Sequence, residues 1–182
     1  MNWLATLKAR AKSLKRQTLV VYFAARDPRT PAMMRIDVAQ PRDFAAVRAL
    51  IVAGLTQRWR EYDPSRNPDL EAFESYYGSA LTVVARRATV IVGCGTLIFE
   101  APRVARIVRM SVADAHRRSG VGRAVLQSLI EHAVRLGYAA IVLETSADWR
   151  SAVAFYDGCG FARTHERDGD QHFRLDLGDR NT

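Results

Sequence analysis

Seven residues, Arg117-Arg118-Ser119-Gly120-Val121-Gly122-Arg123, separate a strand-like segment from a helix-like segment. The preceding residues 106–112 alternate in character as a β-strand does, and apolar residues then recur at helical spacing from Val125 to Leu136. Glycines at such a junction let the backbone approach a ligand closely, because they carry no Cβ atom. The helix begins with unpaired N–H groups and the positive end of its dipole. The sequence therefore predicts an anion site, and the three arginines suit a phosphate group.

Two common nucleotide-binding patterns fit this turn poorly. A Rossmann dinucleotide site has Gly-x-Gly-x-x-Gly and an acidic residue at the end of the next strand. Here Gly122 is followed by Arg123-Ala124-Val125, and no acidic residue stands at the expected place. A P-loop needs Gly-Lys-Ser/Thr, which does not follow. A pyrophosphate held by another fold, or a simple turn, remains open for the short pattern alone.

The net charge of +8 comes mainly from the N-terminal end of the chain. Residues 1–35 contain eight lysines and arginines against Asp27 alone, so this segment carries +7 and the remaining 147 residues carry +1. We therefore expect no nucleic-acid partner. No apolar run approaches the ~20 residues that span a bilayer, and no secretory signal is indicated. Cys94 and Cys159 have no partners at metal-ligand spacing, so we expect a cytoplasmic protein with reduced cysteines and no metal.

The pattern along the chain predicts an extension with a linker at residues 1–33 and one domain at residues 34–182. Apolar residues and lysines in the extension form a short basic amphipathic pattern, for contact with a membrane surface, a partner or the chain's own domain. The segment Asp27-Pro28-Arg29-Thr30-Pro31 marks the linker. Residues 14–31 also resemble the opening of YkvA-like proteins, small predicted membrane proteins of bacteria, although the hydrophobic body of that family does not follow.

The domain's length and its hydrophobic content, 48% for the whole chain, suffice for a real core. Apolar periodicity, β-branched residues and glycine or proline breaks predict an ordered series of elements. We expect strands at 35–38, 81–85, 89–99, 106–112 and 139–143, helices at 41–55, 70–77, 123–136 and 151–157, and a final hairpin from 160 to 175.

The order of these elements, with Arg-x-x-Gly-x-Gly before a helix and then Ala152-x-x-x-Tyr156 and Gly160-Phe161, resembles the GNAT (Gcn5-related) N-acetyltransferase superfamily over residues 34–177. The resemblance implies an α/β (α+β) fold with a mixed, mostly antiparallel central sheet and flanking helices. It also implies that the strand at 106–112 splays away from the strand at 139–143. The ligand implied is acetyl-coenzyme A, used as a co-substrate.

The same resemblance implies how coenzyme A is bound. Backbone groups of Met110, Ser111 and Val112 would bind the pantetheine arm, as an added strand pairs with an exposed sheet edge. The turn from Arg117 to Arg123 would bind the pyrophosphate, mainly through backbone amides. Side chains of Arg117, Arg118 and Arg123 would either contact phosphate or remain solvated. Family members often have asparagine seven residues before the tyrosine, but this chain has Trp149, which would stack on cofactor or substrate or cover the core.

Two residues match catalytic positions of the family. Tyr156 matches the tyrosine that donates a proton to the leaving thiolate. Some histone-acetylating relatives have a glutamate base at the position of Arg106, and this chain lacks it. Ribosomal-protein N-terminal acetyltransferases place a glutamate twelve residues before the tyrosine, which here is Glu144. We expect burial at the strand end to raise the pKa of this carboxyl toward that of a base, with a capping or salt-bridge role as the alternative.

The acceptor is less defined. The first helices and their connecting loop form the acceptor wall in this family, and the mixture of acids and aromatics there suits a cationic amine of a small molecule or peptide. These residues are Trp59, Arg60, Glu61, Tyr62, Asp63, Glu71, Glu74, Tyr76 and Tyr77. The alternatives are a different acyl group or acceptor, and a non-catalytic acyl-CoA sensor with a membrane-binding tail. The resemblance leaves a homodimer open, and the presence of both Glu144 and Tyr156 favours an enzyme.

Overall fold

The computed structural model describes residues 34–178, and the predicted N-terminal extension at 1–33 lies outside them. The described chain divides into two compact units. Unit 1 contains residues 34–96 and 109–128, and unit 2 contains residues 97–108 and 129–178. Within residues 34–178, no helix combines the length and the hydropathy needed to span a membrane.

Seven strands form one sheet in the order β1-β2-β3-β4-β5-β7-β6. The pairs β1–β2, β5–β7 and β6–β7 are antiparallel, and β4–β5 is parallel, so the predicted mixed, mostly antiparallel sheet is confirmed. The strands are β1 Met34–Val38, β2 Leu81–Arg87, β3 Val90–Ala101, β4 Val104–Val112, β5 Ala140–Ser146, β6 Ala162–Arg167 and β7 Asp170–Asp176.

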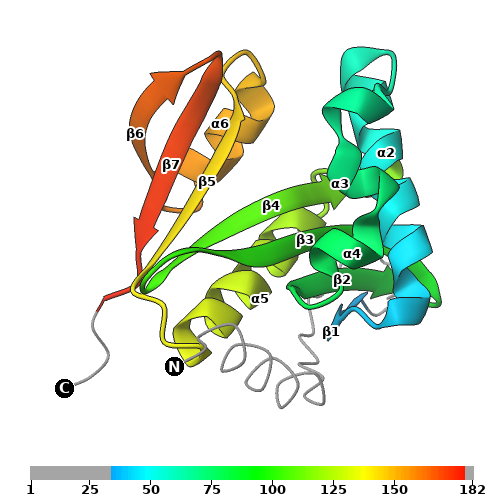
Figure 1. Cartoon of the computed structure of the whole chain (residues 1–182), viewed down its shortest axis with the longest axis horizontal. Coiled ribbons are helices and arrows are strands. Elements are labelled where there is room, and N and C mark those ends of the chain that lie inside the picture. Colours follow the sequence, from blue (N-terminus) through cyan, green and yellow to red (C-terminus); the bar gives the residue numbers. More distant parts are fainter. Residues whose placement is uncertain (1–33, 179–182) are drawn as a thin grey trace. The chain divides into compact units, whose positions relative to one another are not determined.

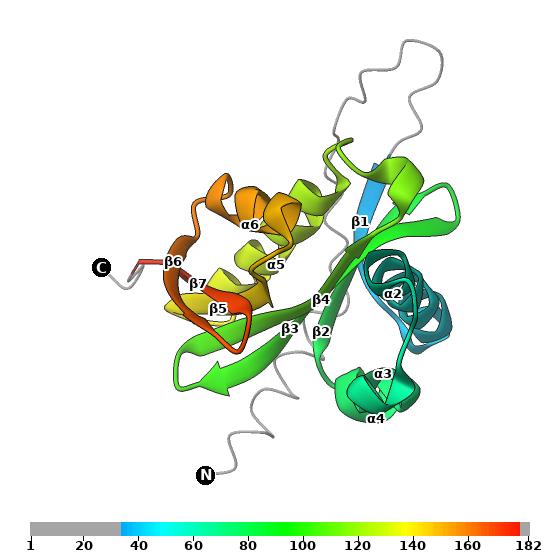
Figure 2. The same cartoon turned by 90° about the horizontal axis from the view of Figure 1, so that it is seen from above.

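In unit 1, helices cover both faces of the strands (Figure 2). Helices α2 (Phe44–Trp59), α3 (Pro68–Glu71) and α4 (Phe73–Tyr77) lie on one face, and the first turns of α5 (Val121–Arg135) lie on the other. The predicted apolar face of α2 is confirmed, because Phe44, Val47 and Ile51 are all buried. Short 3-10 turns precede α2 at Pro41–Asp43 and α3 at Pro64–Arg66, where proline is tolerated.

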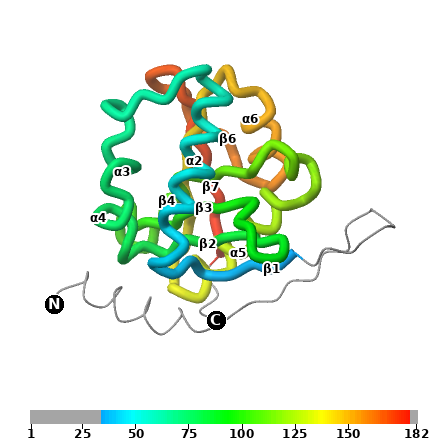
Figure 3. The backbone as a smooth tube through the Cα atoms, turned by 90° about the vertical axis from the view of Figure 1, so that its right-hand side faces the viewer, coloured from blue at the N-terminus to red at the C-terminus, as the bar shows by residue number. Residues whose placement is uncertain are grey.

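The predicted single helix over residues 70–77 is wrong, because the segment forms two short helices that meet at Ala72. Ala72 has φ −119° and ψ 45°, outside the helical region. Arg48 of α2 donates a hydrogen bond from Nε to the carbonyl of Leu70 at 2.6 Å, and a continuous helix would offer that carbonyl to residue 74. The chain thus returns beside α2 as α3 and then α4 (Figure 3).

Unit 2 is built around β5, where the predicted buried strand is confirmed by Ala140, Ile141 and Leu143. Helix α6 (Arg150–Asp157) lies against β5 and the β6–β7 hairpin (Figure 1). The parallel register of β4 and β5 joins Val104–Arg106 with Ala140–Val142 and goes no further, although both strands continue. Pairing between these strands therefore stops in the middle of the sheet, as the resemblance implied.

Candidate functional site: a glycine turn, a strand with a left-handed residue and two candidate catalytic side chains

The turn predicted to bind an anion lies directly before α5. Arg118 and Gly120 have φ values of 58° and 87°, which turn the chain sharply between the short helical turn Asp114–His116 and α5. The first bond of the helix joins the Ala124 N–H to the Gly120 carbonyl at 3.0 Å. The amides of Val121 and Gly122 precede that bond, so they have no intrahelical acceptor and remain available to an anion.

Close packing on β3 positions this helix start. Val121 is 1% exposed, and a Cβ at position 93 would lie 2.5 Å from its Cγ1 atom. Only glycine at position 93 therefore lets the first turn of α5 approach β3 without displacement. Sequence reasoning did not single out Gly93, because its role depends on a residue 28 positions away in the chain.

The arginines of the turn differ in their contacts. Arg117 bends back within its own turn, where Nη1 lies 3.3 Å from a carboxylate oxygen of Asp114 and Nε donates to the Val112 carbonyl at 3.3 Å. Arg118 and Arg123 are exposed. Ser119 donates from Oγ to the carbonyl of His116 at 2.7 Å, which holds the turn rather than presenting the hydroxyl outward.

The end of β4 carries the three residues expected to bind the pantetheine arm, Met110, Ser111 and Val112. Ser111 donates from Oγ to the Leu50 carbonyl of α2 at 3.2 Å. A Cβ at Gly54 would lie 2.8 Å from the same Oγ, so glycine permits this approach of α2 to the strand. Directly before these residues, Arg109 has φ 55° inside the strand.

Arg109 is the centre of a polar network that sequence reasoning missed. Its guanidinium donates to both carboxylate oxygens of Asp69, at 2.8 and 2.5 Å, and to Oδ1 of Asn67 at 3.0 Å. Tyr77 donates its hydroxyl to Asp69 at 2.6 Å. Burial by itself raises the pKa of Asp69, but the bonds from Arg109 and Tyr77 outweigh it and the pKa is lowered. In the sequence, a charged residue inside a half-buried strand was the signal that could have identified this network.

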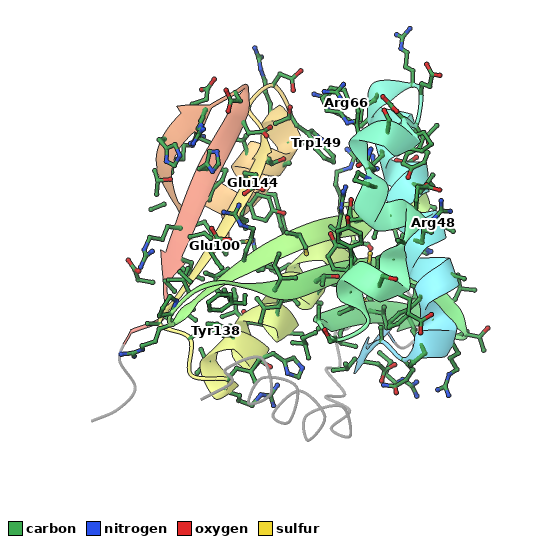
Figure 4. All side chains as sticks on the ribbon, viewed as in Figure 1. Arg48, Arg66, Glu100, Tyr138, Glu144 and Trp149 are labelled. Atoms are coloured by element: carbon green, nitrogen blue, oxygen red, sulfur yellow. The ribbon has the colours of Figure 1, made fainter. Side chains whose placement is uncertain are left out.

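Glu144 lies in unit 2 in a different setting from the one we expected. The prediction of a buried carboxyl is wrong, because 34% of its side-chain surface is exposed and the carboxylate forms an ion pair with Arg106. Arg106 also donates to both oxygens of Glu100, each at 2.7 Å, and the side chains of Glu100 and Glu144 lie in the same part of unit 2 (Figure 4). The residue at the position of the missing family glutamate thus holds Glu144 in place.

Two stacked histidines lie beside Glu144. His172 of β7 lies directly opposite Glu144 in the antiparallel register, so both side chains emerge on the same face of the sheet. His172 stacks on His165 of β6, with ring centroids 4.3 Å apart and planes 8° apart. Sequence reasoning missed both histidines, since only strand register brings them together.

Tyr156 is buried on α6, with 7% of its surface exposed. Its ring packs against Phe155, Phe161 and Phe173 at centroid distances between 5.1 and 5.9 Å. Burial raises the pKa of the hydroxyl above its usual value of 10.0, which keeps it protonated at neutral pH. Trp149 stands at the start of the same helix, where its carbonyl accepts bonds from the Ala152 and Val153 amides at 2.9 and 3.1 Å.

The predicted acceptor wall is partly occupied by internal contacts. Glu71 accepts hydrogen bonds from Arg48 at 2.6 Å and from Tyr62 at 2.7 Å, and Tyr77 is buried against Asp69. Trp59 and Tyr76 are the large exposed aromatics of this region, at 51% and 57%. Within residues 34–178, no group of three or more histidine, cysteine or acidic side chains is arranged to hold a metal ion.

The fold and the glycine turn define the class of protein. The model of the "Acetyltransferase (GNAT) family" matches residues 44–161, and the chain belongs to this family. The chain is 34% identical over 107 residues to "Probable N-acetyltransferase 14" of Xenopus tropicalis, covering 54% of this chain and 50% of that protein. It is 36% identical over 61 residues to "N-acetyltransferase family 8 member 3" of Mus musculus, covering 34% of this chain and 27% of that protein. The chain thus spans half or less of these curated relatives.

Solved structures share the fold. A GNAT-family acetyltransferase from Staphylococcus aureus Mu50 aligns with a TM-score of 0.71 at 20% identity, over 80% of this chain and 99% of that chain. The PaiA N-acetyltransferase from Thermoplasma acidophilum, solved in complex with coenzyme A, aligns with a TM-score of 0.71 at 12% identity, over 79% and 98%. At these identities the likeness establishes the architecture of this chain.

Proposed function

We propose that this chain is an acetyl-CoA-dependent N-acetyltransferase, which moves the acetyl group to an amine of a small molecule or peptide by direct attack on the thioester. The observation that carries the proposal is the turn before α5, where φ of 58° at Arg118 and 87° at Gly120 leaves the first amides of the helix open. In a chain of the GNAT family, the anion that suits these amides is the pyrophosphate of coenzyme A.

The donor is held mainly by backbone groups in this proposal. The amides at the start of α5 bind the pyrophosphate, and Met110, Ser111 and Val112 pair with the pantetheine amides as a strand edge does. Arg118 and Arg123 add positive charge, whereas Arg117 first has to leave Asp114. Trp149 cannot copy the donor and acceptor of the family asparagine, so it stacks on the cofactor or the substrate, or covers the core.

In the proposed reaction, one residue accepts a proton and another donates one. The amine nitrogen attacks the thioester carbonyl carbon, the C–N bond forms, and the C–S bond breaks. Glu144 takes the proton that the amine loses, and its place is set by the ion pair with Arg106. Tyr156 gives its proton to the leaving thiolate, and its burial in an aromatic cluster keeps that proton on the oxygen.

Exposed aromatic rings support the class of acceptor, and a buried thiol supports the compartment. The exposed rings of Trp59 and Tyr76 suit a cationic amine, since an ammonium is attracted to an aromatic face. We place the protein in the cytoplasm, because Cys94 is a buried thiol, as in reduced proteins.

A test of this function measures release of free thiol from acetyl-CoA across small amines and peptides. The full chain is compared with Tyr156→Phe, and Tyr138→Phe serves as control because Tyr138 is also a buried tyrosine of unit 2. We expect amine-dependent thiol release that falls in Tyr156→Phe alone. Binding of acetyl-CoA without turnover on any acceptor would contradict an enzyme and favour a sensor.

A further inference from the structure

Arg109 has a backbone conformation that its neighbours must enforce. Among residues 34–178, six non-glycine residues have positive φ, and Arg109, at 55°, is the one that lies inside a β-strand. The other five lie in turns or at a helix end. A left-handed residue within a strand interrupts the regular pleat and redirects the groups that follow it, and we call this irregularity at Arg109 the bulge. Such a conformation persists only where surrounding contacts over-determine it.

The contacts that enforce it come from the side chain of Arg109. The guanidinium forms a two-pronged pair with Asp69 of α3 and a third bond with Asn67. Asp69 is 9% exposed and also accepts the Tyr77 hydroxyl of α4, so its position is fixed from both short helices. A guanidinium bound to Asp69 and Asn67 at once fixes the far end of the side chain, and this clamp favours the backbone conformation from which it reaches both.

The backbone on either side of the bulge is fixed as well. The Arg109 carbonyl accepts a weak bond from Cys94 Sγ at 3.6 Å. Two residues later, Ser111 Oγ reaches the Leu50 carbonyl. Further on, the Ala113 amide is paired with the Val92 carbonyl at 2.9 Å. The residues before, within and after the segment 110–112 are therefore each held by a hydrogen bond.

We propose that the Arg109–Asp69 pair is a positioning device for the donor, which holds the bulge so that the backbone groups of Met110, Ser111 and Val112 face the pantetheine arm. This inference rests on the proposed function. Arg109 and Asp69 are positioning residues, because they act through the backbone of their neighbours. Asp69 lies in α3, and Tyr77 lies in α4, the helix that also carries Tyr76. The same clamp therefore keeps the acceptor wall and the donor-binding strand in a fixed relation within unit 1.

The chain offers a matched ion pair for comparison. Arg86 of β2 donates to Asp43 at 2.7 Å and to Asp37 at 3.2 Å, and Asp43 is 6% exposed. The side chains of Arg86 and Asp43 are 14% and 8% exposed, against 22% and 13% for Arg109 and Asp69. Arg86 lies in β2 and Asp43 in the 3-10 turn before α2, away from residues 110–112. Loss of the Asp43 charge therefore measures the stability cost of breaking such a pair, without moving the donor-binding segment.

The experiment measures dissociation constants of the full chain and its variants by calorimetry, for acetyl-CoA and for 3′-phospho-ADP, which lacks the pantetheine arm. We expect Asp69→Asn and Arg109→Lys to bind acetyl-CoA about tenfold more weakly, which corresponds to ~1.4 kcal/mol. Their affinity for 3′-phospho-ADP stays at the wild-type value. Asp43→Asn lowers the melting temperature to a similar extent but leaves both dissociation constants unchanged.

Three results would overturn the inference: unchanged acetyl-CoA binding in both clamp variants, an equal loss of affinity for 3′-phospho-ADP, or an equal loss in Asp43→Asn. If Asp69→Asn does not fold, Arg109→Lys and Tyr77→Phe decide, since each keeps part of the network. Failure of the wild-type chain to bind acetyl-CoA would instead refute the proposed function itself, and the inference with it.

Discussion

Arg106 of β4 and Glu144 of β5 form an ion pair inside unit 2, and the guanidinium is shared with Glu100 of β3. The hydrogen bonds to Glu100 raise the pKa of Arg106, so the guanidinium stays charged. The pair holds Glu144 in place although 34% of its side-chain surface is exposed. Glu100 and Glu144 contact the same guanidinium from two different strands, β3 and β5.

Replacement of Glu144 by glutamine tests the base. The amide keeps a hydrogen-bond acceptor for Arg106 but cannot take a proton from the amine, so we expect kcat to fall about 100-fold. The acidic limb of the pH–rate profile should disappear. Glu100→Gln is the control. It removes a carboxylate charge from the same arginine, and it should keep nearly full activity. A wild-type acidic limb in Glu144→Gln would rule Glu144 out.

Replacement of Tyr156 by phenylalanine tests the acid. The ring keeps its packing against Phe161 and Phe173, so the melting temperature should change little. Without the proton donor, we expect kcat to fall by a factor of about 100 while the dissociation constant for acetyl-CoA stays the same. Tyr138→Phe should leave both quantities at wild-type values. Equal turnover in the two variants would remove Tyr156 from the mechanism.

The left-handed turn before α5 makes a prediction about Gly120. Alanine there meets no atom within 4 Å, so the cost is the strain of φ 87° in a residue with a Cβ, about 1–2 kcal/mol. Because relief of that strain would reorient the first amides of α5, we expect weaker binding of acetyl-CoA in calorimetry. Gly137→Ala, at φ 82° after the other end of the helix, should lose similar stability with unchanged affinity. Equal affinities in both variants would contradict the prediction.

The clamp at Arg109 predicts the order of stability of two small substitutions. If φ 55° persisted, glycine would be favoured over alanine, whose Cβ is strained there. Because both substitutions remove the guanidinium that holds this conformation, we expect the strand to relax and Arg109→Ala to be at least as stable as Arg109→Gly in urea unfolding. A glycine variant more stable by about 1 kcal/mol would show that the conformation persists without the clamp.

His132 predicts the response of stability to acid. It is 2% exposed, its Nδ1 has no hydrogen-bond partner in the described part of the chain, and burial lowers its pKa from 6.5 to about 4. The folded state resists protonation where the unfolded state accepts it, so stability is full above pH 6.5 and falls as the pH drops toward 4. Between pH 7.5 and 5 we expect a loss of roughly 2 kcal/mol. His132→Leu should show less of this loss in urea titrations, and an unchanged slope would assign it elsewhere.

Most of the fold was predictable because it follows from local patterns. Alternation and β-branched residues predicted the strands, and the three- and four-residue apolar spacing predicted α2 and α5. The exception at Ala72 arose from Arg48, which lies 22 residues before Leu70 and takes its carbonyl. A local pattern carries no information about such a distant donor.

The sequence by itself determined the class of the chain and the position of the glycine turn before α5, because glycines, arginines and helix periodicity act within a few residues of one another. Tertiary structure decided the environment of the reactive groups. Glu144 is held by Arg106 rather than buried, and Arg109 is clamped by Asp69 into a conformation that its own residue type disfavours. Both outcomes depend on side chains that lie 38 and 40 positions apart and meet only through folding.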